Sequence, residues 1–180
     1  MFKQRKTADT KIETIFQEPK AYMSTNAYAK MSNIVDICDK EVGWLGTANW
    51  IEENNIILID DIYLFHQEVN SSTCEITSEG LAKFAEELLQ KENGIETWNN
   101  IKLWGHSHVN MSVSPSGQDN KQMEVFADHN DWFLRIIANK SGELKLDLYD
   151  YKANLSYIDL KWELFIPEMF NTLEFIEGEI

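Results

Sequence analysis

Residues 103–119 read LWGHSHVNMSVSPSGQD, a stretch that sets two histidines, one residue apart, just before a polar turn and an aspartate. If the residues around the histidines form a strand over 101–108, the two-residue period of that strand places His106 and His108 on the same face. The proline and glycine of the polar segment predict a turn that folds back and brings Asp119 to the same point. Two imidazoles and one carboxylate form a three-ligand set that suits zinc and leaves a coordination position open.

The composition predicts one globular domain with an acidic surface. The chain has 180 residues, 43% of them hydrophobic, and a formal net charge of -14. This length is enough for a single domain with a buried core. The negative charge repels phosphate backbones and anionic lipids, so we expect neither a nucleic-acid nor a membrane partner. Since no apolar run reaches membrane-spanning length and the N-terminal residues lack the apolar centre of a secretion signal, the sequence predicts a cytoplasmic protein.

Apolar periodicity and turn residues predict the elements. Apolar residues recur every three or four positions over 24–39 and 77–94, which predicts two main helices, and 119–127 predicts a shorter one. Candidate N-caps are Ser24, Thr25 or Asn26 for the first helix and Thr77 or Ser78 for the second. Strands are expected over 41–51, 56–69, 101–108, 132–139, 143–151 and 155–165. Residues 12–23 are expected to form an edge strand or an irregular entry to the fold, and residues 71–76 a short connection or strand. The pattern is typical of an α+β fold, with a mixed, largely antiparallel sheet flanked by two main helices.

The same reading divides the chain into three parts. We expect a flexible basic arm over residues 1–11 and a single domain over residues 12–165. Residues 166–180 are expected to form a C-terminal helical tail that packs on the domain or on a partner.

The segment HSHVNMSVSPSGQD matches the HxHx7SxxD signature of the JAMM zinc metalloproteases, also called MPN-plus domains. Glu41 lies where that family keeps an upstream glutamate, ahead of a hairpin, a helix and the metal strand. The chain therefore resembles prokaryotic or phage members of this family, which are related to deubiquitinating isopeptidases. The resemblance implies the family's three-layer, cytidine-deaminase-like fold, with His106, His108 and Asp119 as zinc ligands. It also implies Ser116 as the donor that stabilises the oxyanion and Glu41 as the general base.

The chemistry of these groups is consistent with amide hydrolysis. Zinc lowers the pKa of a bound water to about 7, and a nearby carboxylate can carry the water's proton to the departing amine. A hydroxyl donor stabilises the charge that develops on the carbonyl oxygen. We therefore expect zinc-dependent hydrolysis of a peptide or isopeptide bond in a protein tail, with release of a ubiquitin-like protein as one form of that activity.

Alternatives remain open for several of these residues. Ser116 can be only a turn former or a helix cap. Val109 follows the second histidine, where many eukaryotic members of the family have proline. Four other acidic residues are candidates for the general base in place of Glu41: Asp36, Asp39, Glu52 and Glu53.

The alternative function is a non-catalytic scaffold or binding module of the MPN type. Such members of the family have usually lost the metal ligands, which are present in this sequence. Hydrolysis of a small amide or a nucleotide by the same zinc site is a third possibility, although the acidic surface disfavours a polyanionic substrate.

Overall fold

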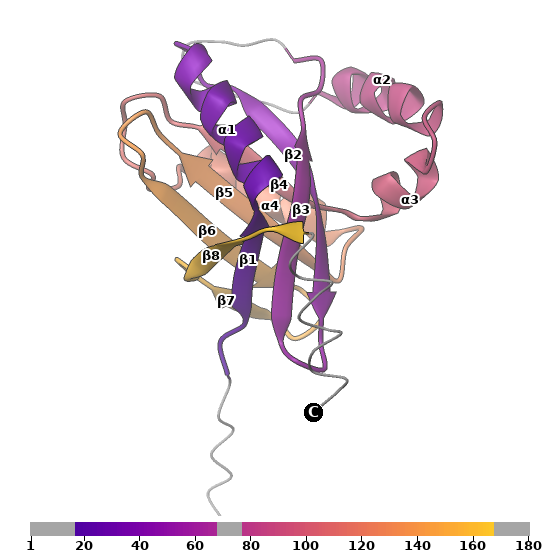
Figure 1. Cartoon of the computed structure of the whole chain (residues 1–180), viewed down its shortest axis with the longest axis vertical. Coiled ribbons are helices and arrows are strands. Elements are labelled where there is room, and N and C mark those ends of the chain that lie inside the picture. Colours follow the sequence, from indigo (N-terminus) through magenta and orange to yellow (C-terminus); the bar gives the residue numbers. More distant parts are fainter. Residues whose placement is uncertain (1–16, 68–76, 168–180) are drawn as a thin grey trace, which may run out of the picture.

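One eight-stranded sheet runs through the described part of the chain. The computed structural model describes residues 17–67 and 77–167, and Figure 1 shows how the helices surround the sheet. The strands are β1 (Lys20–Ser24), β2 (Gly43–Ile51), β3 (Ile56–Tyr63), β4 (Ile101–Ser107), β5 (Trp132–Ala138), β6 (Leu144–Asp150), β7 (Leu155–Tyr157) and β8 (Trp162–Phe165). Their order in the sheet is β7-β6-β5-β4-β2-β3-β1-β8. β1 runs parallel to β3 and β8, and β4 runs parallel to β5, whereas the other neighbours are antiparallel.

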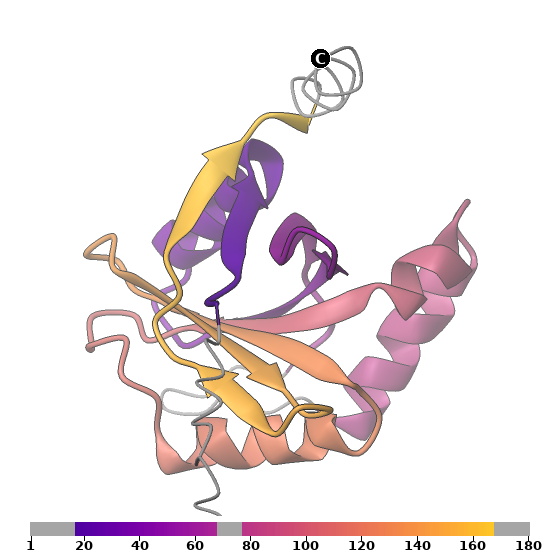
Figure 2. The same ribbon diagram turned by 90° about the horizontal axis from the view of Figure 1, so that it is seen from below.

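The sheet is curled into a half-barrel (Figure 2). It has a hydrophobic core on each face. On the concave side, α1 (Thr25–Ile37) contributes Met31 to a cluster that also includes Ile59 of β3 and Leu134 of β5. On the convex side, Phe84 of α2 (Ser78–Leu89) and Met123 of α4 (Gly117–Ala127) belong to a second cluster. The short α3 (Gly94–Asn99) follows α2. Because successive strand residues point to opposite faces, the same strands supply both clusters.

The three-layer MPN/JAMM arrangement expected from the resemblance was wrong. In place of a sheet flanked by two main helices, the described residues form a curled mixed sheet with four helices. The pairing of β2 shifts register between Gly46 and Thr47 towards β4, and between Thr47 and Ala48 towards β3. Irregularities of this kind bend a strand and increase its twist, which favours curling of the sheet around α1.

The predicted helices over 24–39 and 77–94 are present as α1 and α2, and side-chain caps define where they begin. Ser24 Oγ accepts a hydrogen bond from Ala27 N at 3.0 Å. Thr77 Oγ1 accepts one from Gly80 N at 3.0 Å. Each cap satisfies an amide that has no partner within its own helix, so the candidate caps at these two positions were confirmed.

The single strand predicted over 155–165 is two strands on opposite edges of the sheet. β7 pairs with β6, whereas β8 pairs with β1. Asp159 has a φ of 61°, a left-handed conformation that cannot continue a strand. Between the two strands, Leu160 N donates to Leu146 O at 2.7 Å. The same arrangement corrects the prediction for β1, which was expected to be an edge strand or an irregular entry but is a strand that lies between β3 and β8.

Some predictions fall outside the described residues. These are the basic arm over 1–11, the short connection or strand over 71–76 and all but the first two residues of the tail over 166–180. Within the part of the chain that the structure describes, no helix combines the length and the apolar character needed to cross a membrane.

Candidate metal centre

Both histidines lie at the end of the central strand β4. On one side of this strand His106 pairs with Gly43 of β2, and on the other it faces β5. The strand ends at Ser107, but His108 N still donates to Ala138 O of β5 at 2.8 Å. Pairing on both sides therefore fixes the backbone that carries the imidazoles. His106 is 2% and His108 is 6% exposed, so both rings lie largely out of solvent.

Asp119 reaches the histidines from the first turn of α4. Ser116 Oγ accepts a hydrogen bond from Asp119 N at 3.2 Å, and Asp119 Oδ2 accepts one from Ser116 N at 2.6 Å. This reciprocal pair is a capping box, which ties the start of the helix to the orientation of its carboxylate. A hydrogen bond to a ligating carboxylate positions it for an ion.

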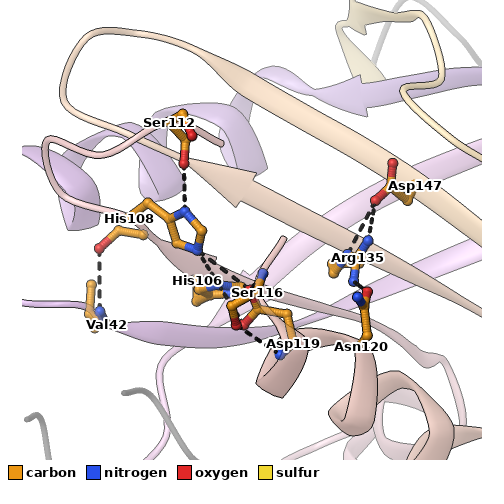
Figure 3. A network of polar contacts seen from close by, with 10 residues as sticks. Val42, His106, His108, Ser112, Ser116, Asp119, Asn120, Arg135 and Asp147 are labelled. Atoms are coloured by element: carbon orange, nitrogen blue, oxygen red, sulfur yellow. Dashed lines mark hydrogen bonds and ion pairs between the residues drawn. The ribbon is translucent and has the colours of Figure 1, made fainter. Parts of the chain in front are cut away.

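The donor atoms of these three residues converge on one point (Figure 3). His106 Nε2 lies 3.0 Å from His108 Nε2 and 3.1 Å from Asp119 Oδ1, and His108 Nε2 lies 3.6 Å from Asp119 Oδ2. Zinc bonds of about 2.0–2.1 Å in a tetrahedral site place neighbouring ligand atoms roughly 3.4 Å apart. The observed separations bracket that value, so this buried cluster can hold a metal ion.

The tautomer of His108 favours a cation at this point. His108 Nδ1 lies 2.6 Å from Ser112 O. Because a carbonyl oxygen only accepts, Nδ1 carries the proton, and Nε2 of the neutral ring then presents a lone pair. That lone pair faces His106 and the carboxylate of Asp119. Ligating histidines in metal sites are commonly oriented by such a bond from the second ring nitrogen.

The ring of His106 is held by packing. It stacks on Trp104, with ring centroids 4.6 Å apart and an interplanar angle of 21°. His106 Nδ1 is buried and has no hydrogen-bond partner among the described residues. The indole of Trp104 is itself buried, so it packs against the ring of His106 and does not line an open groove.

The charges within the cluster act on one another. When no ion is bound, a proton on Nε2 lets each ring donate to Asp119. Burial acts to raise the pKa of the Asp119 carboxyl, but these hydrogen bonds from His106 and His108 outweigh it and hold that pKa well below its usual range. The hydrogen bond to Asp119 raises the pKa of His108, against the effect of burial. Asp119 therefore remains ionised near neutral pH, which is the form that coordinates a metal.

Glu41 lies beside the cluster, on the segment that leads into β2. It is 6% exposed. The pKa of His108 is raised mainly by its hydrogen bond to Asp119, and the charge of Glu41 adds to the effect. Ser107 N donates to Val42 O at 2.9 Å, which holds this segment against the strand that carries the histidines. The upstream glutamate is thus a near neighbour of the metal centre.

The alternative bases lie in exposed positions. Asp39 binds Lys140 Nζ at 2.6 Å. Glu52 and Glu53 lie in the turn after β2, at the end of that strand opposite Gly43. Asp36 lies in the last turn of α1. Glu41 is therefore the only one of the five candidates that is both buried and close enough for its charge to affect a cluster histidine.

Ser116 occupies the position of a helix cap, one of the two roles considered for it. Ser116 is exposed, and its Oγ accepts a hydrogen bond from Asp119 N. A hydroxyl that accepts a hydrogen bond can still donate its own hydrogen. The cap therefore leaves the donor function of Ser116 available to a substrate.

An ion pair that the sequence did not single out anchors α4 to the sheet (Figure 3). Arg135 donates to Asp147 Oδ2 from Nη2 at 2.6 Å and from Nε at 3.2 Å. Its Nη1 donates to Asn120 Oδ1 at 2.9 Å, next to the ligand Asp119. The signal in the sequence was an arginine within the apolar strand WFLRIIA and an aspartate between two leucines in LKLDLYD. Ser112 gave no such signal, because it acts through its backbone carbonyl.

Val109 shows how the loop after the ligands departs from the family pattern. Its φ is 50°, a conformation that is rare and strained for a β-branched residue. Proline has a fixed negative φ and cannot adopt this conformation. The proline of many eukaryotic members is therefore incompatible with the path of this loop.

No protein-family model matches the chain, and no curated protein is significantly similar to it.

Proposed function

We propose that the protein is a zinc-dependent hydrolase that cleaves a peptide or isopeptide bond in a protein tail, with chemistry resembling that of the JAMM metalloproteases. The observation that carries the proposal is the convergence of donor atoms from His106, His108 and Asp119, all within 4.8 Å of one another. Because the half-barrel differs from the fold expected for that family, the proposal rests on the metal centre and its motif.

Zinc suits this donor set better than the other common divalent cations. Calcium and magnesium prefer sites made of oxygen ligands, whereas two imidazoles and one carboxylate are typical of catalytic zinc. Structural zinc sites usually have four protein ligands, often thiolates. The cluster in the described residues has three ligands, and Cys38 is not among them. A three-ligand set leaves a position for water or substrate.

The chain's own groups divide the remaining work. When bound, zinc polarises the scissile carbonyl and lowers the pKa of water at the site to about 7. Glu41 accepts a proton from that water and passes it to the departing amine, which in an isopeptide is a lysine side chain. Ser116 donates its hydroxyl hydrogen to the carbonyl oxygen as negative charge develops there. Its place at the N-terminus of α4 adds the positive end of the helix dipole.

The surroundings of the cluster favour an extended tail as substrate. Residues 110–112, which follow the histidines, are exposed, so the donor atoms lie just beneath a solvent-facing loop. The net charge of -14 disfavours acidic substrates and favours neutral or basic ones. The C-terminal tail of a ubiquitin-like protein, joined to a lysine, is such a substrate if the tail is extended and carries no net negative charge.

The experiment combines metal analysis with a cleavage assay on the full chain. Purified protein, reconstituted with zinc and freed of excess metal, is expected to retain one zinc per chain. It should then cleave members of a quenched-fluorescent library that contains both peptides and Gly-Gly isopeptides on lysine. A chelator should abolish cleavage, and added zinc should restore it.

Two results would contradict the proposal in different ways. Failure to retain zinc would contradict the assignment of His106, His108 and Asp119 as a zinc site. Stoichiometric zinc without cleavage of any library member would point instead to a non-catalytic binding module.

A further inference from the structure

The side chain of Gln67 continues the sheet beside the metal centre. Its Oε1 accepts a hydrogen bond from Gly43 N at 2.8 Å, and its Nε2 donates to Gly43 O at 2.8 Å. One amide side chain thus pairs with both backbone groups of a single residue. This is the pairing that a neighbouring strand would otherwise supply.

Gln67 takes this role because β3 ends too early to do so. The pairing of β2 with β3 extends only to Leu45 and Tyr63. Beyond that point the chain leaves the ladder, and the Gln67 side chain returns to the next backbone groups of β2. The other edge of Gly43 pairs with His106 of β4. The start of β2 is therefore held on both sides, although strand pairing exists on only one of them.

The segment that precedes Gly43 is held from the β4 side as well. Ser107 N donates to Val42 O at 2.9 Å. Ser107 Oγ accepts from Val42 N at 3.3 Å and donates to Lys40 O at 3.4 Å. Ser107 is fully buried between the two histidines in sequence. These bonds hold the backbone of the residues directly before and after Glu41. The Gln67 amide holds Gly43, two positions after Glu41.

We propose that Gln67 is a positioning residue for Glu41. The inference rests on the proposed function, in which Glu41 transfers the proton. Gln67 acts through the backbone of Gly43, the first residue of β2, which lies two residues after Glu41. A shift of about 1 Å in a catalytic group is enough to lower turnover by about 100-fold.

A merely structural role for Gln67 makes a different prediction. If the amide only satisfies two buried backbone groups, its loss lowers stability and leaves the turnover of the folded, zinc-loaded enzyme unchanged. If it positions Glu41, its loss lowers kcat while KM and zinc content stay at the wild-type level. The two roles are therefore separated by kinetics on folded protein.

The test uses Gln67→Glu and Gln67→Met in the full, zinc-loaded chain. Glu has the same shape but sets a carboxylate oxygen against Gly43 O, and Met keeps the length without either hydrogen bond. Both variants are expected to lose about 100-fold in kcat, with unchanged KM and one zinc per chain. Amide hydrogen exchange at Gly43 should accelerate in both. Gln90→Glu, at the exposed end of α2, makes the same chemical change away from the site and should behave as wild type.

The outcomes separate this inference from the proposed function. A wild-type kcat in either folded, zinc-loaded variant would overturn the inference. It would also be overturned if the variants had low activity because they no longer bind zinc. If one variant does not fold, the other decides. Absence of zinc or turnover in the wild-type protein would instead defeat the proposed function, and the positioning role would fall with it.

Discussion

Trp44 and Gly105 face each other across β2 and β4, and the indole of Trp44 occupies the space that a side chain at Gly105 would need. Gly105 lies directly before the first ligand, His106. The indole therefore packs directly against the backbone that leads into the metal centre. This packing also explains why a residue without Cβ precedes the ligand.

Gly105→Ala should therefore disturb both stability and metal binding. The added methyl group would overlap with the Trp44 ring, and overpacking of a closed core costs about 1–3 kcal/mol. Urea denaturation of the metal-free protein measures this cost, and zinc titration should show weaker binding. Gly117→Ala is the control, since a Cβ there meets no atom within 4 Å. Equal stability of the two variants would show that the Trp44 ring can move aside without lowering the free energy of unfolding.

Glu41→Gln should separate metal binding from turnover. The variant keeps the size of the side chain but cannot accept the proton, so it should retain one zinc and lose about 100- to 10,000-fold in kcat. Glu53→Gln, in the exposed turn after β2, should remain as active as the wild type. Zinc content and steady-state kinetics provide the measurements. Near-normal cleavage by Glu41→Gln would assign the base to another residue.

Asp119→Ala and Ser116→Ala should differ in their effect on the metal. Both remove part of the capping box, which costs about 1 kcal/mol in the metal-free protein. Only Asp119→Ala removes a ligand, so zinc should no longer raise its melting temperature. Ser116→Ala should bind zinc normally, because Ser116 N still holds the carboxylate. Its kcat should fall by about 100- to 1,000-fold if the hydroxyl stabilises the oxyanion.

Arg135→Met should be among the most destabilising single changes. It would leave Asp147, which is 1% exposed, without its counter-charge, at a cost of about 3–5 kcal/mol. Lys30→Met breaks the more exposed pair with Asp61 and should cost less than about 1 kcal/mol. Chemical denaturation measures both changes. Combining Arg135→Met with Asp147→Leu should recover most of the loss, and an equal loss in the double variant would refute the ion-pair explanation.

The sequence predicted most of what is local in this protein. The common face of His106 and His108 follows from the two-residue period at the end of β4, and the turn towards Asp119 follows from nearby proline and glycine residues. The main helices follow from apolar spacing and from caps such as Ser24. All of these depend on residues within one or two turns of each other, where periodicity is informative.

The features that the sequence did not predict depend on long-range pairing. Residues 155–165 contain enough apolar residues for one strand, but the left-handed Asp159 divides them between opposite edges of the sheet. The register shifts in β2, which favour curling of the sheet, occur in its pairing with β3 and β4. Contacts such as that of Gln67 with Gly43, or of His108 with the carbonyl of Ser112, form only once the chain has folded.

The ligands of the cluster come from the end of one strand and the start of one helix, joined by residues 109–118. An ion held by His108 and Asp119 would close this connection into a small ring, much as a cross-link does. Ring closure removes conformational freedom from the intervening chain. The exposed residues 110–112 would then resist proteases while the ion is bound and become cleavable when it is removed, so the cutting pattern of the loop would record metal occupancy.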